Sequence, residues 1–172
     1  MSLFNSSGFE RLQKTKDYQK FENNDDARNI IIGEINNALR QIIIFTPDLE
    51  ADLYDKDSIR EGLLKFCRGN RNAQTQILTG DTSEAIHYGH QLIRLAQQLS
   101  SSMQIRIAGD EYKNTGISFI VIDQKSFLFK PDITKHHSFG DHCKYQSAQL
   151  LDFFIPAWNQ AIQDPQTKRL NI

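Results

Sequence analysis

The sequence reads TGISFIVID at residues 115–123 and SFLFK at residues 126–130. The first run is apolar and rich in β-branched and aromatic residues, which is typical of a buried strand. Asp123 and the two polar residues that follow it predict a tight turn. The two runs therefore predict a hairpin, and the rest of the chain can be interpreted around it.

Helix-like and strand-like segments alternate along the remaining sequence. Expected helices begin near Asn24, span 58–69 and 86–100, and begin again near Ser147, while expected strands span 42–45, 74–79 and 103–107. The strand at 42–45 has no polar alternation, which suits a strand covered on both faces. The alternation predicts an α/β fold with a mixed, mostly parallel β-sheet sandwiched between helices.

The remaining segments lack a sustained period. Residues 1–23 are polar and are expected to form a flexible N-terminal arm. Residues 24–163 are expected to form one α/β domain, and residues 164–172 a C-terminal tail. Between Pro131 and Gln146 we expect an extended, mobile loop, because no apolar pattern anchors it.

Composition limits the classes of function. Of the 172 residues, 39% are hydrophobic and 24% are charged, as is usual for a soluble globular domain. Twenty Lys and Arg against 21 Asp and Glu give a formal net charge of -1. This balance gives no strong case for a partner that is nucleic acid or an anionic membrane.

The two cysteines, Cys67 and Cys143, show no metal or redox spacing, so free thiols in a reducing compartment are expected. The apolar runs are too short for a membrane span, and the N-terminus lacks the order of a signal peptide. We therefore expect a cytoplasmic protein.

Acidic residues follow the first expected strand at Glu50, Asp52, Asp55 and Asp57. Their alternation resembles a calcium-binding loop, but that loop requires a glycine and a closing glutamate. Leu53 and Ile59 occupy those positions. A solvated acidic loop is the better interpretation.

The order of the segments resembles a half-domain of the phospholipase D superfamily. The matching pieces are IIIFTPDLE, SIREGLLKFC, TQILTGD, GHQLIRLAQQL, MQIRIA, ISFIVID and AQLLDFFIPAWNQA, the last with the spacing Phe154-x-x-x-Trp158. The family carries an H-x-K-x-x-x-x-D signature on a strand. With the signature anchored on Asp123, Gly116 stands at the histidine position and Ser118 at the lysine position.

These departures bear on activity. In the family the histidine is the nucleophile and the lysine neutralises phosphoryl charge, and neither Gly116 nor Ser118 can do so. The family's Gly-Ser-x-Asn stretch would fall on residues 130–133, which read KPDI. The resemblance implies a degenerate, non-catalytic module of a bacterial-type cytoplasmic protein, without cofactor, binding a partner or a phosphate-bearing ligand in a vestigial cleft. Asp123 needs no catalytic explanation, because Asp commonly precedes a tight turn.

Histidines supply the remaining candidates for chemistry. The ligand-binding candidates are His136, His137, Asp141 and His142. They suggest an alternative function, a hydrolase or phosphodiesterase that uses this segment and is possibly metal-dependent. No known ligand spacing is matched, so no metal site is assigned, and histidines that are exposed or bonded to backbone in a polar loop are the better interpretation. His87 and His90, one turn apart, favour surface or capping roles.

The resemblance also implies an assembly. In the family, two copies of the half-domain complete one active site, and this chain supplies one copy. We therefore expect a homodimer whose contact includes Ser118 and the end of its strand.

Overall fold

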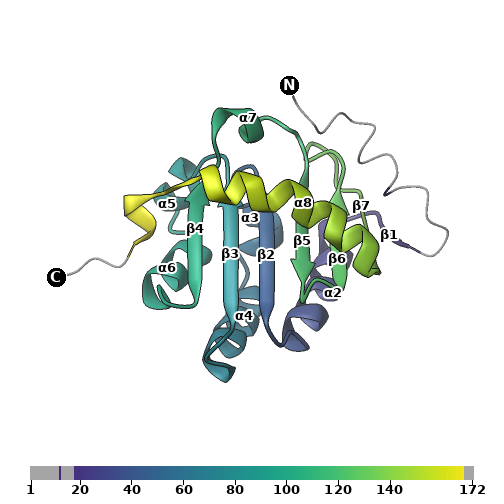
Figure 1. Ribbon diagram of the computed structural model, residues 1–172, viewed down its shortest axis with the longest axis horizontal. Coiled ribbons are helices and arrows are strands. Elements are labelled where there is room, and N and C mark those ends of the chain that lie inside the picture. The colour runs from purple at the N-terminus through teal and green to yellow at the C-terminus, as the bar shows by residue number, and fades with distance from the viewer. Residues whose placement is uncertain (1–11, 13–17, 169–172) are drawn as a thin grey trace.

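The computed structural model describes residue 12 and residues 18–168, which form one mixed β-sheet with helices on both faces (Figure 1). The strands are β1 (Gln19–Phe21), β2 (Gln41–Thr46), β3 (Gln74–Thr79), β4 (Met103–Ile107), β5 (Ser118–Ile122), β6 (Ser126–Lys130), β7 (Ser138–His142) and β8 (Ile162–Gln163). The helices are α2 (Asn24–Asn36), α3 (Ala51–Tyr54), α4 (Asp57–Gly69), α5 (Ser83–His87), α6 (Gln91–Gln98), α7 (Asp110–Lys113), α8 (Lys144–Gln160) and the 3-10 turn η2 (Pro165–Thr167).

The strand order is β1-β7-β6-β5-β2-β3-β4-β8. Only the pairs β2–β3 and β3–β4 are parallel, and every other pair is antiparallel. The sandwiched mixed sheet is confirmed, but the prediction that it is mostly parallel is wrong. A parallel neighbour needs a long crossover, which here runs through α3 and α4 or through α5 and α6, whereas β5, β6 and β7 follow one another through connections that contain no helix.

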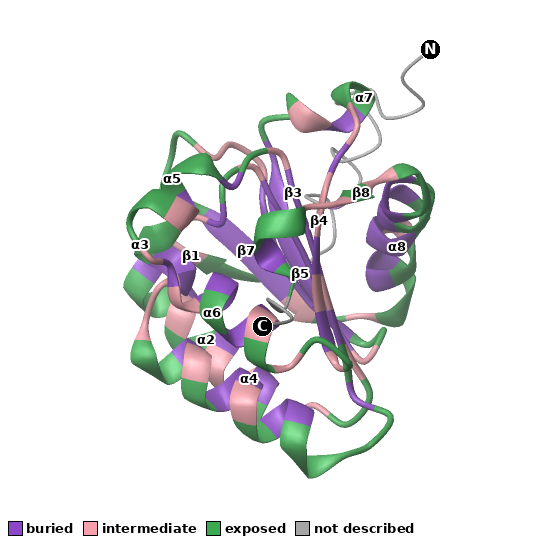
Figure 2. Ribbon diagram, turned by 90° about the vertical axis from the view of Figure 1, so that its left-hand side faces the viewer, coloured by how far each residue is buried: buried purple, intermediate pink, exposed green. Residues whose placement is uncertain are grey.

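Alternation along each strand gives the sheet two apolar faces. Ile42 and Ile44 of β2 point to a core shared with α2, α4 and α6, whereas Ile43 and Phe45 point to a core under α8. Figure 2 shows α8 on one side of the sheet and the other three helices on the opposite side. Because both faces are covered, the central strands lack polar alternation.

The segment predicted as a loop between Pro131 and Gln146 contains a strand. Residues 138–142 form β7, which pairs with β6 on one side and β1 on the other, and α8 already begins at Lys144. Phe139 is buried, but its neighbours Ser138 and Gly140 are not apolar side chains, so the sequence shows no strand-like alternation here. Backbone pairing on both edges, rather than side-chain pattern, therefore holds this strand.

The predicted arm, tail and third helix also differ from expectation. Residues 1–11, 13–17 and 169–172 lie outside the described residues, but Gln19–Phe21 of the predicted arm joins the sheet as β1. Within the predicted tail, Thr167 is buried. The helix expected over 86–100 is divided into α5 and α6, because Gly89 between them has φ +70°.

Across the described part of the chain, no helix is both long and apolar enough to cross a membrane.

Candidate functional site

The positions matched to the family signature lie at opposite ends of β5. Gly116 precedes the strand with φ +71°, and a Cβ added there would meet no atom within 4 Å. Ser118 begins the strand and is only 2% exposed. Asp123 follows the other end of the strand, with φ 52°. Its side chain is therefore separated from Gly116 and Ser118 by the length of β5.

Asp123 ties the β5–β6 turn to the start of β2. Its carboxylate accepts backbone N–H bonds from Leu39 at 2.8 Å, Arg40 at 2.7 Å and Gln41 at 2.9 Å. Burial alone would raise the pKa of Asp123, but the three N–H donors outweigh it and hold the pKa below the ordinary value. These contacts give the residue a structural role, as its place before a tight turn suggested.

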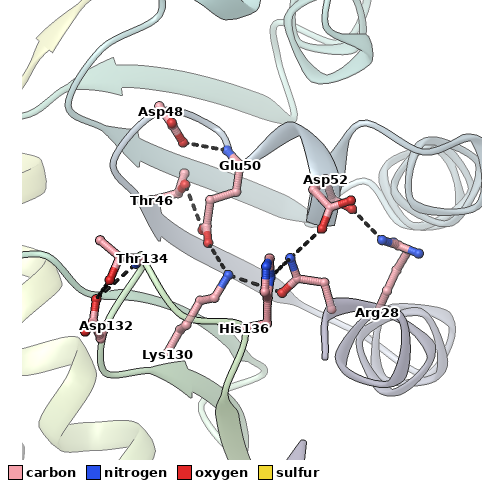
Figure 3. Close-up of polar contacts among 10 residues, drawn as sticks. Arg28, Thr46, Asp48, Glu50, Asp52, Lys130, Asp132, Thr134 and His136 are labelled. Carbon is pink, nitrogen blue, oxygen red and sulfur yellow. Dashed lines mark hydrogen bonds and ion pairs between the residues drawn. The ribbon is translucent and has the colours of Figure 1, made fainter. Parts of the chain in front are cut away.

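A buried cation lies at the Ser118 end of the strand. Lys130, the last residue of β6, is the register partner of Ser118 and is 4% exposed. Directly opposed residues of an antiparallel pair project to the same face. The Lys130 ammonium lies 3.0 Å from the Glu50 carboxylate and 3.2 Å from Asn24 Oδ1 (Figure 3).

Glu50 reaches the cation from the loop between β2 and α3. Its second carboxylate oxygen accepts a hydrogen bond from Thr46 Oγ1 at 3.0 Å, and Glu50 N–H donates to Asp48 Oδ1 at 2.9 Å. Leu49 and Glu50 have φ values of 69° and 31°, in the left-handed region that is costly for residues other than glycine. The fold thus imposes this position on Glu50 against local preference.

His90 holds the loop that contains Leu49 and Glu50 through a hydrogen bond. Its Nδ1 accepts the Leu92 N–H at 3.1 Å, so the neutral ring carries its proton on Nε2, which donates to the Leu49 carbonyl at 3.1 Å. The imidazole is 1% exposed, and burial lowers its pKa despite the nearby Asp55 carboxylate. The predicted capping role of His90 is confirmed by its bond to Leu92.

Asn24, in the first turn of α2, connects the ion pair to the surface. Its Nδ2 donates to Asp52 Oδ2 at 2.6 Å and lies 3.3 Å from His136 Nδ1. Arg28 completes the group by donating to the backbone carbonyl of Asp52 (Figure 3). The hydrogen bond from Asn24 is the main cause of the lowered pKa of Asp52. We call Lys130, Glu50, Thr46 and Asn24 the Lys130 cluster.

The Lys130 cluster contains a positive and a negative charge that are both buried. The side chains of Lys130 and Glu50 are 5% and 9% exposed, and each is hydrogen-bonded to a neutral neighbour as well as to the other. A buried pair is tolerated only with such additional bonds. The cluster contains no hydroxyl–imidazole or thiol–imidazole pair that could act as an activated nucleophile. Where the structure describes the side chains, no group of three or more His, Cys, Asp or Glu could hold a metal ion.

The histidine candidates lie in three different places. His136 reaches Asn24 at the rim of the Lys130 cluster. His137 and His142, at the two ends of β7, lie 3.5 Å from Glu22 and 2.5 Å from Glu34, with side chains 66% and 75% exposed. Asp141 accepts the backbone N–H of His142. The fold therefore does not bring the four candidates together, and none of these contacts is made with Asp123.

Sequence reasoning missed the Lys130 cluster. The available signal was Lys130 at the end of the otherwise apolar run SFLFK. All five residues of this strand are buried, so the lysine is buried with the others. The partner of that lysine could not be identified, because Glu50 and Asn24 are 80 and 106 residues away along the chain. The acidic loop was interpreted as solvated, which is wrong for Glu50.

Sequence comparison gives one family. The model of a domain of unknown function, DUF7931, matches residues 23–170. No curated protein matches the sequence.

Solved structures share the fold. NucT from Helicobacter pylori is similar with a TM-score of 0.64 at 13% identity, over 86% of this chain and 99% of NucT. Nuc from Salmonella typhimurium, a phospholipase D family member, has a TM-score of 0.59 at 12% identity, over 86% and 97%. TrmBL2, an archaeal chromatin protein whose structure shows a novel mode of DNA binding, has a TM-score of 0.64 at 12% identity. The match covers 91% of this chain, which spans only 58% of TrmBL2. These likenesses establish a phospholipase D-like fold.

Proposed function

The chain belongs to the DUF7931 family, and we propose that it is a non-catalytic phospholipase D-like module that binds a partner or a phosphate-bearing ligand. The observation that carries the proposal is the chemistry at the two signature positions. Gly116 offers no nucleophile, and its φ of +71° disfavours any side chain. Ser118 offers a buried hydroxyl in place of a cation.

The charge distribution around these positions supports the same conclusion. The nearest buried cation, Lys130, is neutralised by Glu50 and is not available to stabilise the charge that develops in phosphoryl transfer. Stabilisation of that charge is a large part of catalysis in such reactions, so its absence adds to the effect of a missing nucleophile.

Turnover of phosphodiesters tests this proposal. Purified protein, assayed with a chromogenic phosphodiester and with single-stranded DNA, should show no hydrolysis above the buffer blank. An active phospholipase D family member serves as the positive control. Hydrolysis that persists when His136, His137 and His142 are all replaced by Ala would refute both this function and the histidine-based alternative.

One observation favours that alternative, a hydrolase using the segment 136–142. Glu34 accepts from Ser126 Oγ at 3.0 Å and orients His142, beside a cavity of about 300 Å³ that both residues line. A carboxylate-oriented imidazole can act as a general base. The arrangement is incomplete, because Ser126 is bonded to Glu34 and not to the imidazole. Activity abolished by His142→Ala and retained by His137→Ala would establish the alternative.

A second copy of the chain is the partner that we propose for testing. Large apolar side chains that are exposed include Leu39, Tyr145 and Ile162, but they lie on separate segments of the fold and do not by themselves define the contact. The expected contact through Ser118 needs revision, since its side chain is already buried within one chain. Sedimentation equilibrium at micromolar concentration should give the mass of a dimer, and a monomer at all concentrations would exclude it. DNA binding, described for TrmBL2, is not part of the proposal, because the net charge is -1.

A further inference from the structure

We propose that Glu50 is the internal occupant of an oxyanion-binding site built by Lys130 and Thr46, and that its carboxylate closes this site to free oxyanions of the phosphate class. The inference rests on the proposed function and narrows it: with this site closed by Glu50, the module binds a partner and not free phosphate. The observation behind it is that Lys130 and Thr46 each donate a hydrogen bond to a different oxygen of the Glu50 carboxylate.

The donors converge as they would on a bound anion. Lys130 Nζ donates to Glu50 Oε1 at 3.0 Å, and Thr46 Oγ1 donates to Glu50 Oε2 at 3.0 Å. Thr46 is the last residue of β2 and Lys130 the last of β6, and β5 lies between these strands. The two donors thus reach across three strand ends at one edge of the sheet, and each contacts a different oxygen.

The surroundings fix the donors but leave one positive charge to be balanced. Asn24 turns its amide oxygen to Lys130 and its amide nitrogen to Asp52, so it orients the ammonium without neutralising it. Ser118, the register partner of Lys130, adds no charge. Without the Glu50 side chain beyond Cβ, the buried ammonium and the buried hydroxyl would face the space that its Cγ and carboxylate had filled. A buried charge without a counter-ion is strongly unfavourable, so this space would favour an anion.

Glu50 has the advantage of being part of the same chain. A group held by a rigid backbone acts at an effective concentration well above the millimolar value of a short flexible tether, so millimolar free phosphate would compete poorly with it. Its backbone is held by Asp48 and by the His90 bond to the Leu49 carbonyl, and it starts α3. The consecutive positive φ values of Leu49 and Glu50 are an independent sign that the fold enforces this placement.

Substitution of Glu50 tests the inference. We expect inorganic phosphate to raise the Tm of the wild-type protein only by the general, non-saturating stabilisation that an excluded salt gives to any folded protein. Glu50→Ala should have a lower Tm than wild type, and phosphate should raise it by about 3 °C or more at ten times Kd, since a ligand that binds only the folded state stabilises it. Glu50→Gln keeps the side-chain volume and should respond less, because the amide still fills the site.

Two matched variants identify the site. Glu50→Ala combined with Lys130→Met removes the cation and should lose the phosphate response. Glu61→Ala removes an exposed glutamate that is 69% exposed and should behave as wild type. Titration calorimetry should show that Glu50→Ala binds phosphate at least tenfold more tightly than wild type, Glu61→Ala and the double variant do.

Three outcomes would overturn the inference. In the first, phosphate raises the Tm of Glu50→Ala and of its combination with Lys130→Met by the same amount. In the second, wild type and Glu50→Ala bind phosphate with the same affinity. In the third, chloride and phosphate change the Tm of Glu50→Ala equally. If Glu50→Ala does not fold in chloride, phosphate should restore its circular dichroism spectrum, and failure to do so also counts against the site. Phosphodiester hydrolysis by wild type would instead refute the proposed function, so the two failures can be distinguished.

Discussion

Ser118 of β5 and Lys130 of β6 are direct partners in the antiparallel sheet, and both are buried on the face that meets α2. A cation is therefore present one strand away from the position at which the signature comparison predicts a lysine. Its charge is used internally, in the pair with Glu50. Gly116 and Ser118 stand at the positions compared with the signature, while the neighbouring strand carries a lysine that is paired with Glu50.

The Lys130–Glu50 pair should show strong energetic coupling. Lys130→Met alone leaves the Glu50 carboxylate buried without its partner, which should lower the free energy of unfolding by about 3–5 kcal/mol. Lys130→Met with Glu50→Leu should recover most of the loss, because an apolar pair of similar volume needs no desolvation of charge. Urea denaturation measures each variant. Lys113→Met, at an exposed pair with Asp110, is the control and should cost less than about 1 kcal/mol. A double variant as unstable as the sum of both single variants would contradict the coupling.

Gly116 should resist substitution for backbone reasons alone. A Cβ at either Gly116 or Gly109 meets no atom within 4 Å, but only Gly116 has a positive φ. Gly116→Ala should therefore lower the free energy of unfolding by about 1–2 kcal/mol, whereas Gly109→Ala should be neutral or slightly stabilising. Thermal or urea unfolding of the two variants decides the matter. Equal effects would mean that the left-handed conformation at Gly116 is not required.

His90 should make stability fall in mild acid. Burial lowers its pKa in the folded chain, and an unfolded histidine titrates near about 6.5. Between these values the unfolded chain binds a proton that the folded chain does not, so stability is lost as the pH falls from about 6.5 through the folded pKa. Urea denaturation at a series of pH values should show this loss.

The control separates His90 from the other histidines. His90→Gln should be less stable at neutral pH and should show a weaker dependence on pH below 6.5, whereas the exposed His87→Gln should keep the wild-type dependence. Identical pH profiles for wild type and His90→Gln would exclude the proposed titration.

Amide exchange should divide the segment predicted as a mobile loop. Residues 138–142 pair with β6, with β1 or with both, so their exchange should be slow. Residues 136 and 137 should exchange more quickly, whereas the amides of Ile133, Thr134 and Lys135 are hydrogen-bonded and should be intermediate. Exchange followed by mass spectrometry with overlapping peptides can resolve the two parts. Fast exchange throughout 131–146 would restore the interpretation of the whole segment as a loop and contradict β7.

Local sequence determined the elements whose pattern is strong. The apolar runs at 42–45 and 115–123 predicted buried strands. The lack of polar alternation at 42–45 also predicted cover on both faces, because a strand without a polar face must be shielded from solvent on both sides. The turn after Asp123 was predicted by residue type, and the hydrogen bond from Lys125 N–H to the Ile122 carbonyl at 3.0 Å confirms it. These features depend on neighbours in the chain, which is why they could be predicted.

Tertiary structure alone decided which strands pair in parallel or antiparallel directions and where the Lys130 cluster lies. β7 has little apolar pattern and exists because β6 and β1 satisfy its backbone on both edges. Lys130 is buried because Glu50 and Asn24 come to it from 80 and 106 residues away, and Glu50 does so through a backbone conformation that its own residue type disfavours. Charge pairing acts through space, so the sequence specified each partner but only the fold could bring them together.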